Sequence, residues 1–198
     1  MYIELDGGDT VQENRDGGEE RRNEFVDAAE KLFRENGIVD TTISSIVKEM
    51  NVAKGLFYYY FKSKDDVIDA ISEKYNEVFN EMMNASMDHS DYPSRLRQFV
   101  SNTVASFRDL DNKLSTAEDV DLSQLSIRSI EEAKANAIDA LTALFEEGNE
   151  KDELMLVHPK YYADILISGV IELVSQKEAE DDEIKEIILD LIERAGKD

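Results

Sequence analysis

The sequence predicts an all-α protein of about nine helices: an N-terminal three-helix helix-turn-helix head, followed by a larger helical domain. Apolar residues recur at the three- and four-residue spacing of helices from about Glu19 to Ala195. We find neither the alternating pattern of strands nor an internal repeat. Two short helical segments, 43–50 and 54–60, are separated by only a tight turn. We therefore expect a flexible acidic arm (1–18), the head (19–64) and the larger domain (65–198).

Apolar faces and capping residues indicate the helices of the head. The face of the first helix consists of Phe25, Ala28, Ala29, Leu32 and Phe33. Gly37 suits the end of this helix, and Thr42 can cap the second helix through its hydroxyl group. Asn51 can take the left-handed position in the following turn. Ser63 and Asp66 match a capping box, which predicts a fourth helix that runs into the larger domain.

Proline and glycine residues divide the larger domain. Pro93 and Pro159 suit the first turns of two helices, and Gly148 is expected to end a long one. The expected ranges after the fourth helix are 93–107, 109–121 (one short helix or a loop), 122–147, 159–177 and 182–195.

Composition limits the compartment and the chemistry of the chain. It has no cysteine, so disulfides and thiolate metal sites are excluded. Its first residues lack the basic and apolar regions of a signal peptide, and no segment has the roughly 18 consecutive apolar residues of a membrane span. These features predict a cytoplasmic protein. An acid-rich, high-salt source is one explanation of its net charge of −23, and ordinary surface solubility is another.

The charge is distributed unevenly along the chain. Residues 19–64 carry eight positive and eight negative charges, whereas residues 65–198 carry 13 positive and 32 negative charges. Within 41–64, four lysines accompany a single carboxylate, Glu49. Charges farther away than about 8 Å are largely screened at physiological salt. The basic segment can therefore attract phosphates locally, and the acidic remainder predicts weak non-specific binding to nucleic acid.

The stretch from Val52 to Lys64 carries the strongest functional signal. Three consecutive tyrosines, 58–60, are hard to bury because each phenol needs a hydrogen-bond partner. Together with the flanking lysines they indicate a surface that touches phosphates. The run Ala28–Phe33, Gly37, Thr41–Thr42, Ile46 and Val52–Lys64 resembles the TetR family of transcriptional regulators, over roughly residues 22–70. The resemblance implies a ligand-responsive homodimer that binds two inverted DNA half-sites, most often as a repressor.

The resemblance also implies a set of DNA contacts. The helix 54–60 would lie in the major groove, where Lys54 can donate to guanine or to a phosphate. Tyr58 and Tyr59 are the better contacts among the tyrosines, of which at least one packs inside the head. Thr42 and Lys64 match positions that contact phosphates. The full set of predicted DNA-binding residues is Thr42, Lys54, Gly55, Leu56, Tyr58, Tyr59, Tyr60 and Lys64. Ala53 and Leu56 depart from the family, which commonly has small hydroxyl residues there.

The last two expected helices are more apolar than one inward stripe requires. The residues expected at an interface between two copies are Ile165, Leu166, Gly169, Leu173, Ile184, Ile188 and Leu191. The resemblance implies a four-helix interface built from these helices. The alternative is that the same residues complete the core of a single copy, and both interpretations can hold for different residues.

A small-molecule site is implied in the larger domain. Its candidate lining residues are Phe79, Met83, Phe99, Thr103, Phe107 and Tyr162. Stripes of this kind are more often ordinary core, so the two interpretations remain open. The effector would be at least partly apolar, since flexible methionines suit an adaptable apolar pocket.

Enzymatic motifs are missing from the sequence. His89 and His158 are the only histidines, and neither belongs to a metal-binding pattern such as Glu-x-x-His. Glycine-rich phosphate loops and a nucleophile elbow are also absent. We therefore expect no catalytic residue, no metal site and no cofactor, and we expect double-stranded DNA, an unknown effector and a second copy as partners. The main alternative is a helical interaction protein of the same fold that has lost DNA binding.

Overall fold

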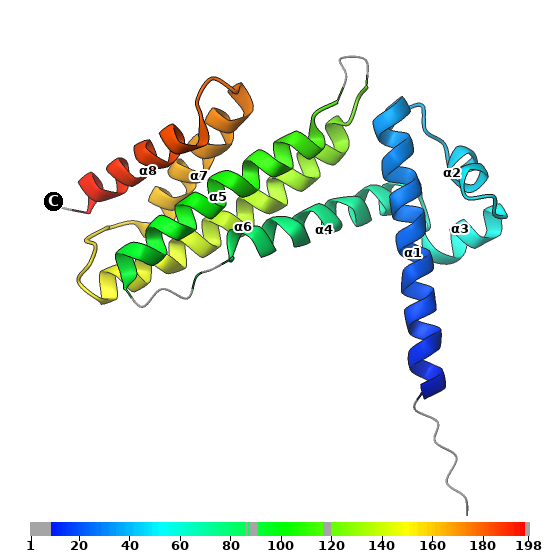
Figure 1. Ribbon diagram of the computed structural model, residues 1–198, viewed down its shortest axis with the longest axis horizontal. Helices are drawn as coiled ribbons and strands as arrows, with labels where there is room; N and C mark the ends of the chain where they lie inside the picture. The colour runs from blue at the N-terminus through cyan, green and yellow to red at the C-terminus, as the bar shows by residue number, and fades with distance from the viewer. Residues whose placement is uncertain (1–8, 86, 88–90, 117–119, 197–198) are drawn as a thin grey trace, which may run out of the picture. The chain divides into compact units, whose positions relative to one another are not determined.

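The computed structural model describes residues 9–85, 87, 91–116 and 120–196, with the side chains of 9–16 omitted. Within these residues it contains eight α-helices and no strand, which confirms the all-α prediction (Figure 1). The chain forms two compact units. The first, which we call the head unit, contains Met1–Ile71 and Thr116–Leu125, and the second, the C-terminal unit, contains Ser72–Ser115 and Ser126–Asp198.

The head unit is built from three complete helices and the start of a fourth. They are α1 (Asp9–Asn36), α2 (Ile43–Glu49), α3 (Lys54–Tyr60) and the first turns of α4 (Lys64–Met83). Its core is aromatic: Phe25, Phe57 and Phe61 are almost completely buried. The ring of Phe57 lies 5.7 Å from that of Phe25 and 5.6 Å from that of Phe61. Such pairs add about 0.5–1.5 kcal/mol each to the energy of burial, and they hold α3 against α1.

The turns of the head follow the sequence prediction. Gly37 has φ = 82° and Asn51 has φ = 54°, so both take the left-handed conformation that ends one helix and redirects the chain. The hydroxyl of Thr41 donates to the carbonyl oxygens of Leu32 and Gly37, at 3.1 and 2.8 Å. These buried bonds tie the segment before α2 to the last turns of α1 and to Gly37.

The first helix is longer than the sequence pattern predicts. Helix α1 begins at Asp9 rather than near Glu19, so the flexible arm expected over 1–18 is helical backbone from Asp9 onward. Helix growth adds one hydrogen bond per residue once a packed turn exists, and this cooperativity extends α1 beyond its apolar face. Residues 1–8 of the expected arm lie outside the described residues.

The C-terminal unit contains the rest of α4 together with α5 (Tyr92–Leu114), α6 (Ser123–Glu150), α7 (Pro159–Gln176) and α8 (Asp181–Ala195). Helix α5 packs against both α7 and α8. Of the two alternatives for 109–121, no separate short helix forms over the described residues, and residues 115, 116, 120 and 121 lie outside any helix. Instead α5 continues to Leu114, because Leu110 and Leu114 are both buried and extend its apolar stripe by two turns. The expected nine helices are therefore eight among the described residues.

Gly148 does not end α6, which continues to Glu150. It is buried, and a Cβ atom added there would lie 2.6 Å from the Cζ atom of Tyr92. The chain turns only at Asp152, which has φ = 58°. Gly148 therefore serves the close approach of α5 and α6, and the sequence pattern alone cannot distinguish this role from that of a helix stop.

Candidate functional site

Helix α2 begins at the capping residue that the sequence indicates. The Thr42 hydroxyl accepts a hydrogen bond of 3.1 Å from the Ser45 backbone amide, and the Ser45 hydroxyl accepts one of 2.9 Å from the Thr42 amide. This reciprocal capping box satisfies two amide groups at the helix start. Thr42 itself is exposed, so its side chain lies at the surface of the head.

Helix α3 presents aromatic rings to solvent. Tyr58 is 51% exposed and Tyr59 79% exposed, whereas Phe57 on the opposite side is fully buried. The ammonium group of Lys54 lies 5.9 Å from the centre of the Tyr58 ring. Tyr60 is half-buried, and its ring lies 5.9 Å from that of Phe25. The structure therefore places Tyr58 and Tyr59 outward and turns Tyr60 toward the core.

The remaining residues of the short helix shape its surface. Gly55 is exposed, and a Cβ atom added there would have no neighbouring atom within 4 Å. The backbone of α3 is therefore accessible at this point because no side chain covers it. Leu56 is half-buried. Ala53 occupies the N-cap position and supplies no side-chain hydrogen bond. Because residue 53 is alanine and has no hydroxyl group, the first amide groups of α3 have no side-chain cap.

The start of α4 is fixed by side-chain hydrogen bonds. The Ser63 hydroxyl donates to Asp66 at 2.8 Å, and the Lys62 amide donates to the same carboxylate at 2.8 Å. These bonds, that of Ser63 first, lower the pKa of Asp66. The ammonium group of Lys64 donates to the carbonyl oxygens of Ile38 (2.6 Å) and Thr41 (3.0 Å). Lys64 thus ties α4 to the turn between α1 and α2.

The electrostatic surface around α3 is basic. Lys48, Lys54 and Lys62 are exposed. Glu49, the single carboxylate of residues 41–64, pairs with Lys31 at 2.6 Å. This pair raises the pKa of Lys31, chiefly through the hydrogen bond to Glu49. The single carboxylate within residues 41–64 is therefore paired with a lysine from outside that segment.

A small internal cavity lies in the C-terminal unit. It is lined by Phe99, Val100, Thr103, Leu141, Leu166, Ile167, Val170 and Ile188. Only about 10 Å³ is open to the centre of a water molecule, which is room for at most one water. The Thr103 hydroxyl is buried and has no hydrogen-bond partner among the described residues. Of the six predicted lining residues, only Phe99 and Thr103 line this cavity.

The other four candidates lie elsewhere in the same unit. Phe79, Met83 and Phe107 are buried, and the rings of Phe79 and Phe107 lie 4.7 Å apart. Tyr162 is 38% exposed and lines a surface groove between α7 and α8. An apolar stripe indicates burial, but it does not indicate which buried side chains border a cavity.

Helices α7 and α8 carry an apolar surface, which we call the α7–α8 face. Its exposed members are Tyr161, Ile165, Ile187 and Leu191, of which Ile165 is 70% exposed. Among the residues predicted at an interface, Leu166, Ile184 and Ile188 are instead buried within the C-terminal unit. Gly169 and Leu173 are half-buried. Leu166, Ile184 and Ile188 therefore belong to the core of a single copy, whereas an interface at the exposed members remains a prediction.

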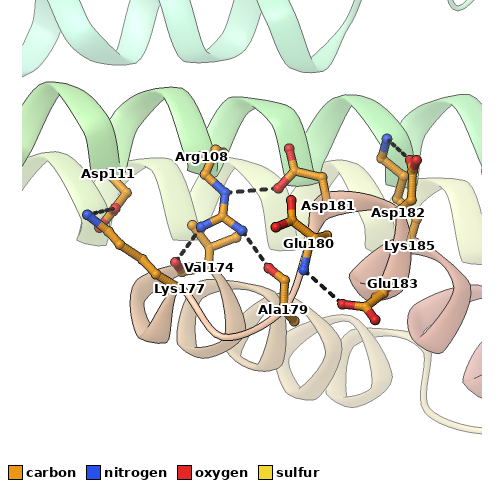
Figure 2. A network of polar contacts seen from close by, with 10 residues as sticks. All are labelled: Arg108, Asp111, Val174, Lys177, Ala179, Glu180, Asp181, Asp182, Glu183 and Lys185. Atoms are coloured by element: carbon orange, nitrogen blue, oxygen red, sulfur yellow. Dashed lines mark hydrogen bonds and ion pairs between the residues drawn. The ribbon is translucent and has the colours of Figure 1, made fainter.

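One guanidinium group fixes the turn between α7 and α8 (Figure 2). Arg108 on α5 donates to the carboxylate of Asp181 at 2.9 Å. It also donates to the carbonyl oxygens of Val174 (2.8 Å) and Ala179 (3.0 Å). A planar guanidinium can satisfy several acceptors at once, which the ammonium of a lysine cannot do with the same geometry. Arg108 therefore holds the two helices of the α7–α8 face against α5, a role that no sequence pattern had indicated.

The described residues form neither a membrane-spanning helix nor a cluster of metal-binding side chains. None of their helices has both the length and the apolar character needed to cross a membrane. No group of three or more acidic or histidine side chains in the described ranges is arranged to hold a metal ion.

The short α2, its turn and the exposed α3 form a helix-turn-helix, and comparisons with known proteins find similar domains. The sequence model described as bacterial regulatory proteins, tetR family, matches residues 25–71. Over 50 residues the chain is 50% identical to the HTH-type transcriptional regulator HbdR of Aromatoleum sp. (strain CIB), a match that covers 25% of this chain and 22% of that protein. Over the head, the chain is therefore similar to members of the TetR family, and it spans less than a quarter of the length of HbdR.

Two further relatives extend the similarity beyond the head. The fatty acid metabolism regulator protein of Bacillus subtilis (strain 168) is 25% identical over 135 residues, 66% of this chain and 69% of that protein. The structure of the fatty acid degradation regulator FadR from Bacillus halodurans has a TM-score of 0.63 and 21% identity, and covers 87% of this chain and 94% of its own. At this identity the structural likeness shows the fold.

Proposed function

We propose that the chain is a homodimeric transcription regulator that acts as a repressor, binds an inverted-repeat operator through residues 42–64 and releases it when a small effector binds. The observation that carries this proposal is the α3 surface. Tyr58 and Tyr59 point outward beside Lys54, while Phe57 anchors the same helix in the core. A helix that is held so firmly on one side and left open on the other is suited to enter the major groove.

Five of the predicted DNA-binding residues and Lys64 have distinct roles in the proposed complex. Lys54 can donate to guanine O6 and N7 or to a phosphate, and the rings of Tyr58 and Tyr59 can pack on thymine methyl groups or place their hydroxyls on phosphates. Gly55 allows the α3 backbone to approach the groove closely. Thr42 lies at the start of α2, where the helix dipole favours a phosphate. Lys64 contributes by holding the start of α4, since its ammonium group binds two carbonyl oxygens of the head.

We propose that two copies associate through the α7–α8 face. Its exposed side chains Tyr161, Ile165, Ile187 and Leu191 form an apolar surface that burial against a second copy would remove from water. A twofold axis through this face would pair each residue with its symmetry mate or near neighbour, and would present two α3 helices to inverted half-sites. Names of relatives such as HbdR, an HTH-type transcriptional regulator, support the regulatory role.

The effector site that we propose is the cavity around Thr103. Its lining is apolar apart from the unpartnered Thr103 hydroxyl, a combination suited to a ligand with an apolar body and one hydrogen-bonding group. The relative from Bacillus subtilis that is named for fatty acid metabolism supports an effector with an apolar chain. Because the cavity has room for at most one water, a larger ligand would bind only a more open state of the C-terminal unit. Binding would stabilise that state, and release of the operator requires such a preference for one state over the other.

Selection of genomic DNA by the purified protein tests this function. Fragments enriched at low salt are expected to share an inverted repeat, and affinity for the repeat should fall as salt rises because phosphate contacts release counterions. Lys54→Ala should weaken binding about 10-fold or more. Arg97→Ala, which removes an exposed basic residue of the C-terminal unit, is the matched control and should leave affinity unchanged. Failure to enrich any sequence from a folded dimer would refute the proposal in favour of an interaction protein of the same fold.

A further inference from the structure

Helix α8 has one side that is buried and another that faces solvent. Ile184, Ile188 and Ile192 recur every four residues and are buried in the core of a single copy. On the other side Ile187 and Leu191, also four residues apart, are 46% and 48% exposed. Residues three or four positions apart share one side of a helix. The exposed pair therefore belongs to a stripe that the core of one copy does not use.

Charged residues of opposite sign lie at the two ends of this stripe. Glu183 lies about one turn before Ile187, and Arg194 lies about one turn after Leu191. Both charged side chains are exposed. From the start of α8 to its end, the exposed side is therefore acidic, then apolar, then basic. We call Glu183, Ile187, Leu191 and Arg194 the outer stripe of α8.

Both charged groups of the outer stripe can form a further hydrogen bond. The Nε atom of Arg194 donates to Asp190 of the same helix at 2.9 Å, and the terminal NH2 groups of the guanidinium remain as donors. One carboxylate oxygen of Glu183 accepts from the Glu180 amide at 3.0 Å, within the capping box of α8 (Figure 2). The other oxygen remains as an acceptor. Each group can therefore bind an opposite charge while keeping its contact in the same copy.

Two copies can place their α7–α8 faces together in two ways. A short turn, residues 177–180, joins α7 to α8, so the two helices run in opposite directions and the end of α7 lies beside the start of α8. If the twofold axis runs along the helices, α8 lies over α7 of the partner. If the axis runs across them, α8 lies antiparallel over α8 of the partner. The charges of the exposed residues distinguish these two arrangements.

The first arrangement brings like charges together. Glu172 is exposed on α7, about two turns after the exposed Ile165, and therefore lies on the same side of that helix. With α8 over the partner's α7, Glu183 at the start of α8 would lie beside the partner's Glu172. Two carboxylates that meet at an interface repel each other, so this arrangement is disfavoured.

The second arrangement brings opposite charges together. Along two antiparallel helices, a step toward the start of one is a step toward the end of the other. If Ile187 faces the partner's Leu191, then Glu183, one turn earlier, faces the last turn of the partner's helix, which contains the partner's Arg194. The twofold axis forms each of these contacts twice. Four aliphatic side chains would be removed from water between two pairs of opposite charges, and both terms favour association.

We propose that the outer stripe selects the partner of this chain and its orientation: a second copy lays its α8 antiparallel along α8, with Glu183 beside the partner's Arg194, an inference that rests on the proposed function. Charges of this kind give specificity because a wrong partner meets a like charge. A related chain without this order of charges would be excluded. The operator would then receive two identical heads.

Charge reversal tests the pairing through the choice of partner. Glu183→Lys and Arg194→Glu each place like charges at both ends of the antiparallel pair, so either variant alone should dimerise at least about tenfold more weakly. Mixing the two variants restores opposite charges at both ends, and the heterodimer should then predominate. The double variant Glu183→Lys/Arg194→Glu should regain the homodimer. Sedimentation measures the affinities, and native mass spectrometry measures the populations of the two dimers.

Two further variants serve as controls. Glu186→Lys makes the same charge change on the same helix, but Glu186 lies about 100° around the helix from Ile187. It should therefore show no preference for Arg194→Glu as a partner. Glu172→Lys tests the other arrangement, because it would remove a repulsion and tighten the dimer if α8 lay over the partner's α7. We expect no tightening from this change.

Each outcome decides the proposal. Preferential heterodimers of the reversed pair, absent with the Glu186→Lys control, would support it. Reversed variants that dimerise as tightly as the unsubstituted protein would overturn it, as would weakened variants whose mixture forms no heterodimer. Tighter association of Glu172→Lys would overturn it in favour of the other arrangement. In all these cases the unsubstituted protein still dimerises and binds its operator, so they differ from failure of the proposed function. An unsubstituted protein that forms no dimer would overturn both.

Discussion

The head unit and the C-terminal unit use different means to form a core. The head is small and is held by aromatic rings at fixed distances, with Phe25, Phe57 and Phe61 in mutual contact. The C-terminal unit packs longer helices through aliphatic side chains and a separate ring pair, Phe79 and Phe107, and its interior also holds the unpartnered Thr103 hydroxyl. The difference is one of arrangement: one cluster of rings centres the head, whereas the core of the C-terminal unit extends along its helices.

The two units also differ in charge and in similarity to known proteins. The family match ends at residue 71, where the N-terminal segment of the head unit ends, and residues 65–198 carry 32 of the 45 carboxylates. A surface that must fit a DNA groove constrains residue identity position by position. A helical core constrains mainly size and apolar character. The head is therefore recognisable from its sequence, and the C-terminal unit is recognisable chiefly from its fold.

Removal of the central Phe57 ring should destabilise the head unit but not the C-terminal unit. Phe57→Ala is expected to cost about 3–5 kcal/mol because it leaves a cavity among three rings. Hydrogen exchange should then accelerate across α2 and α3 while the amides of α5 remain protected. Tyr58→Ala, at the exposed neighbouring position, is the control. Equal loss of protection in α5 would contradict the separate stability of the two units.

Loss of the Arg108 guanidinium should affect the C-terminal unit and its α7–α8 face. Arg108→Ala removes three hydrogen bonds to the α7–α8 turn, and we expect a cost of about 1.5–3 kcal/mol. Sedimentation should show weaker dimerisation, with thermal stability of the head unchanged. Arg108→Lys should recover only part of the loss because it keeps the charge without the fork of donors. Full recovery with lysine would contradict the role of geometry.

A single methyl group should disturb the contact between α5 and α6. Gly148→Ala would place a carbon atom 2.6 Å from the Cζ atom of Tyr92, and overpacking of this kind costs about 1–3 kcal/mol. Gly18→Ala in α1 is the matched control, because no atom lies within 4 Å of its new carbon. The control should be neutral or stabilising, since alanine favours helix. Chemical denaturation of both variants measures the difference, and equal stability would refute the packing role of Gly148.

The smallest predicted effect concerns the cap of α2. Thr42→Ala removes the acceptor for the Ser45 amide and should cost about 1 kcal/mol of head stability. Thr42→Ser keeps the hydroxyl and should retain most of that stability. Thermal unfolding followed by a probe in the head measures the change. A serine variant as unstable as the alanine variant would contradict the capping role.

The success of sequence interpretation differs between the units for physical reasons. Local rules fix the turns of the head: left-handed turns at Gly37 and Asn51 and the Thr42 cap follow from residue type and spacing. Tertiary contacts override such rules in the C-terminal unit. Polar residues after Phe107 suggested an interruption, yet burial of Leu114 extends α5.

The lining of a cavity was beyond the reach of the sequence pattern. Phe99, Thr103 and Phe107 share one stripe of α5, but only the first two border the cavity. Partners far away in the chain, such as Ile188 on α8, decide which side chains leave a gap. The roles of Lys64 and Arg108 depend in the same way on carbonyl groups of distant segments.

The central claim is that the outward tyrosines of α3 bind the operator. Its most direct test is the affinity of a Tyr58→Ala/Tyr59→Ala variant for the selected operator, measured beside the unsubstituted protein with dimerisation monitored in the same buffer. The account predicts a loss of at least about tenfold, since each good base contact contributes about 1–3 kcal/mol, with an unchanged dimer. An operator affinity equal to that of the unsubstituted protein would contradict it.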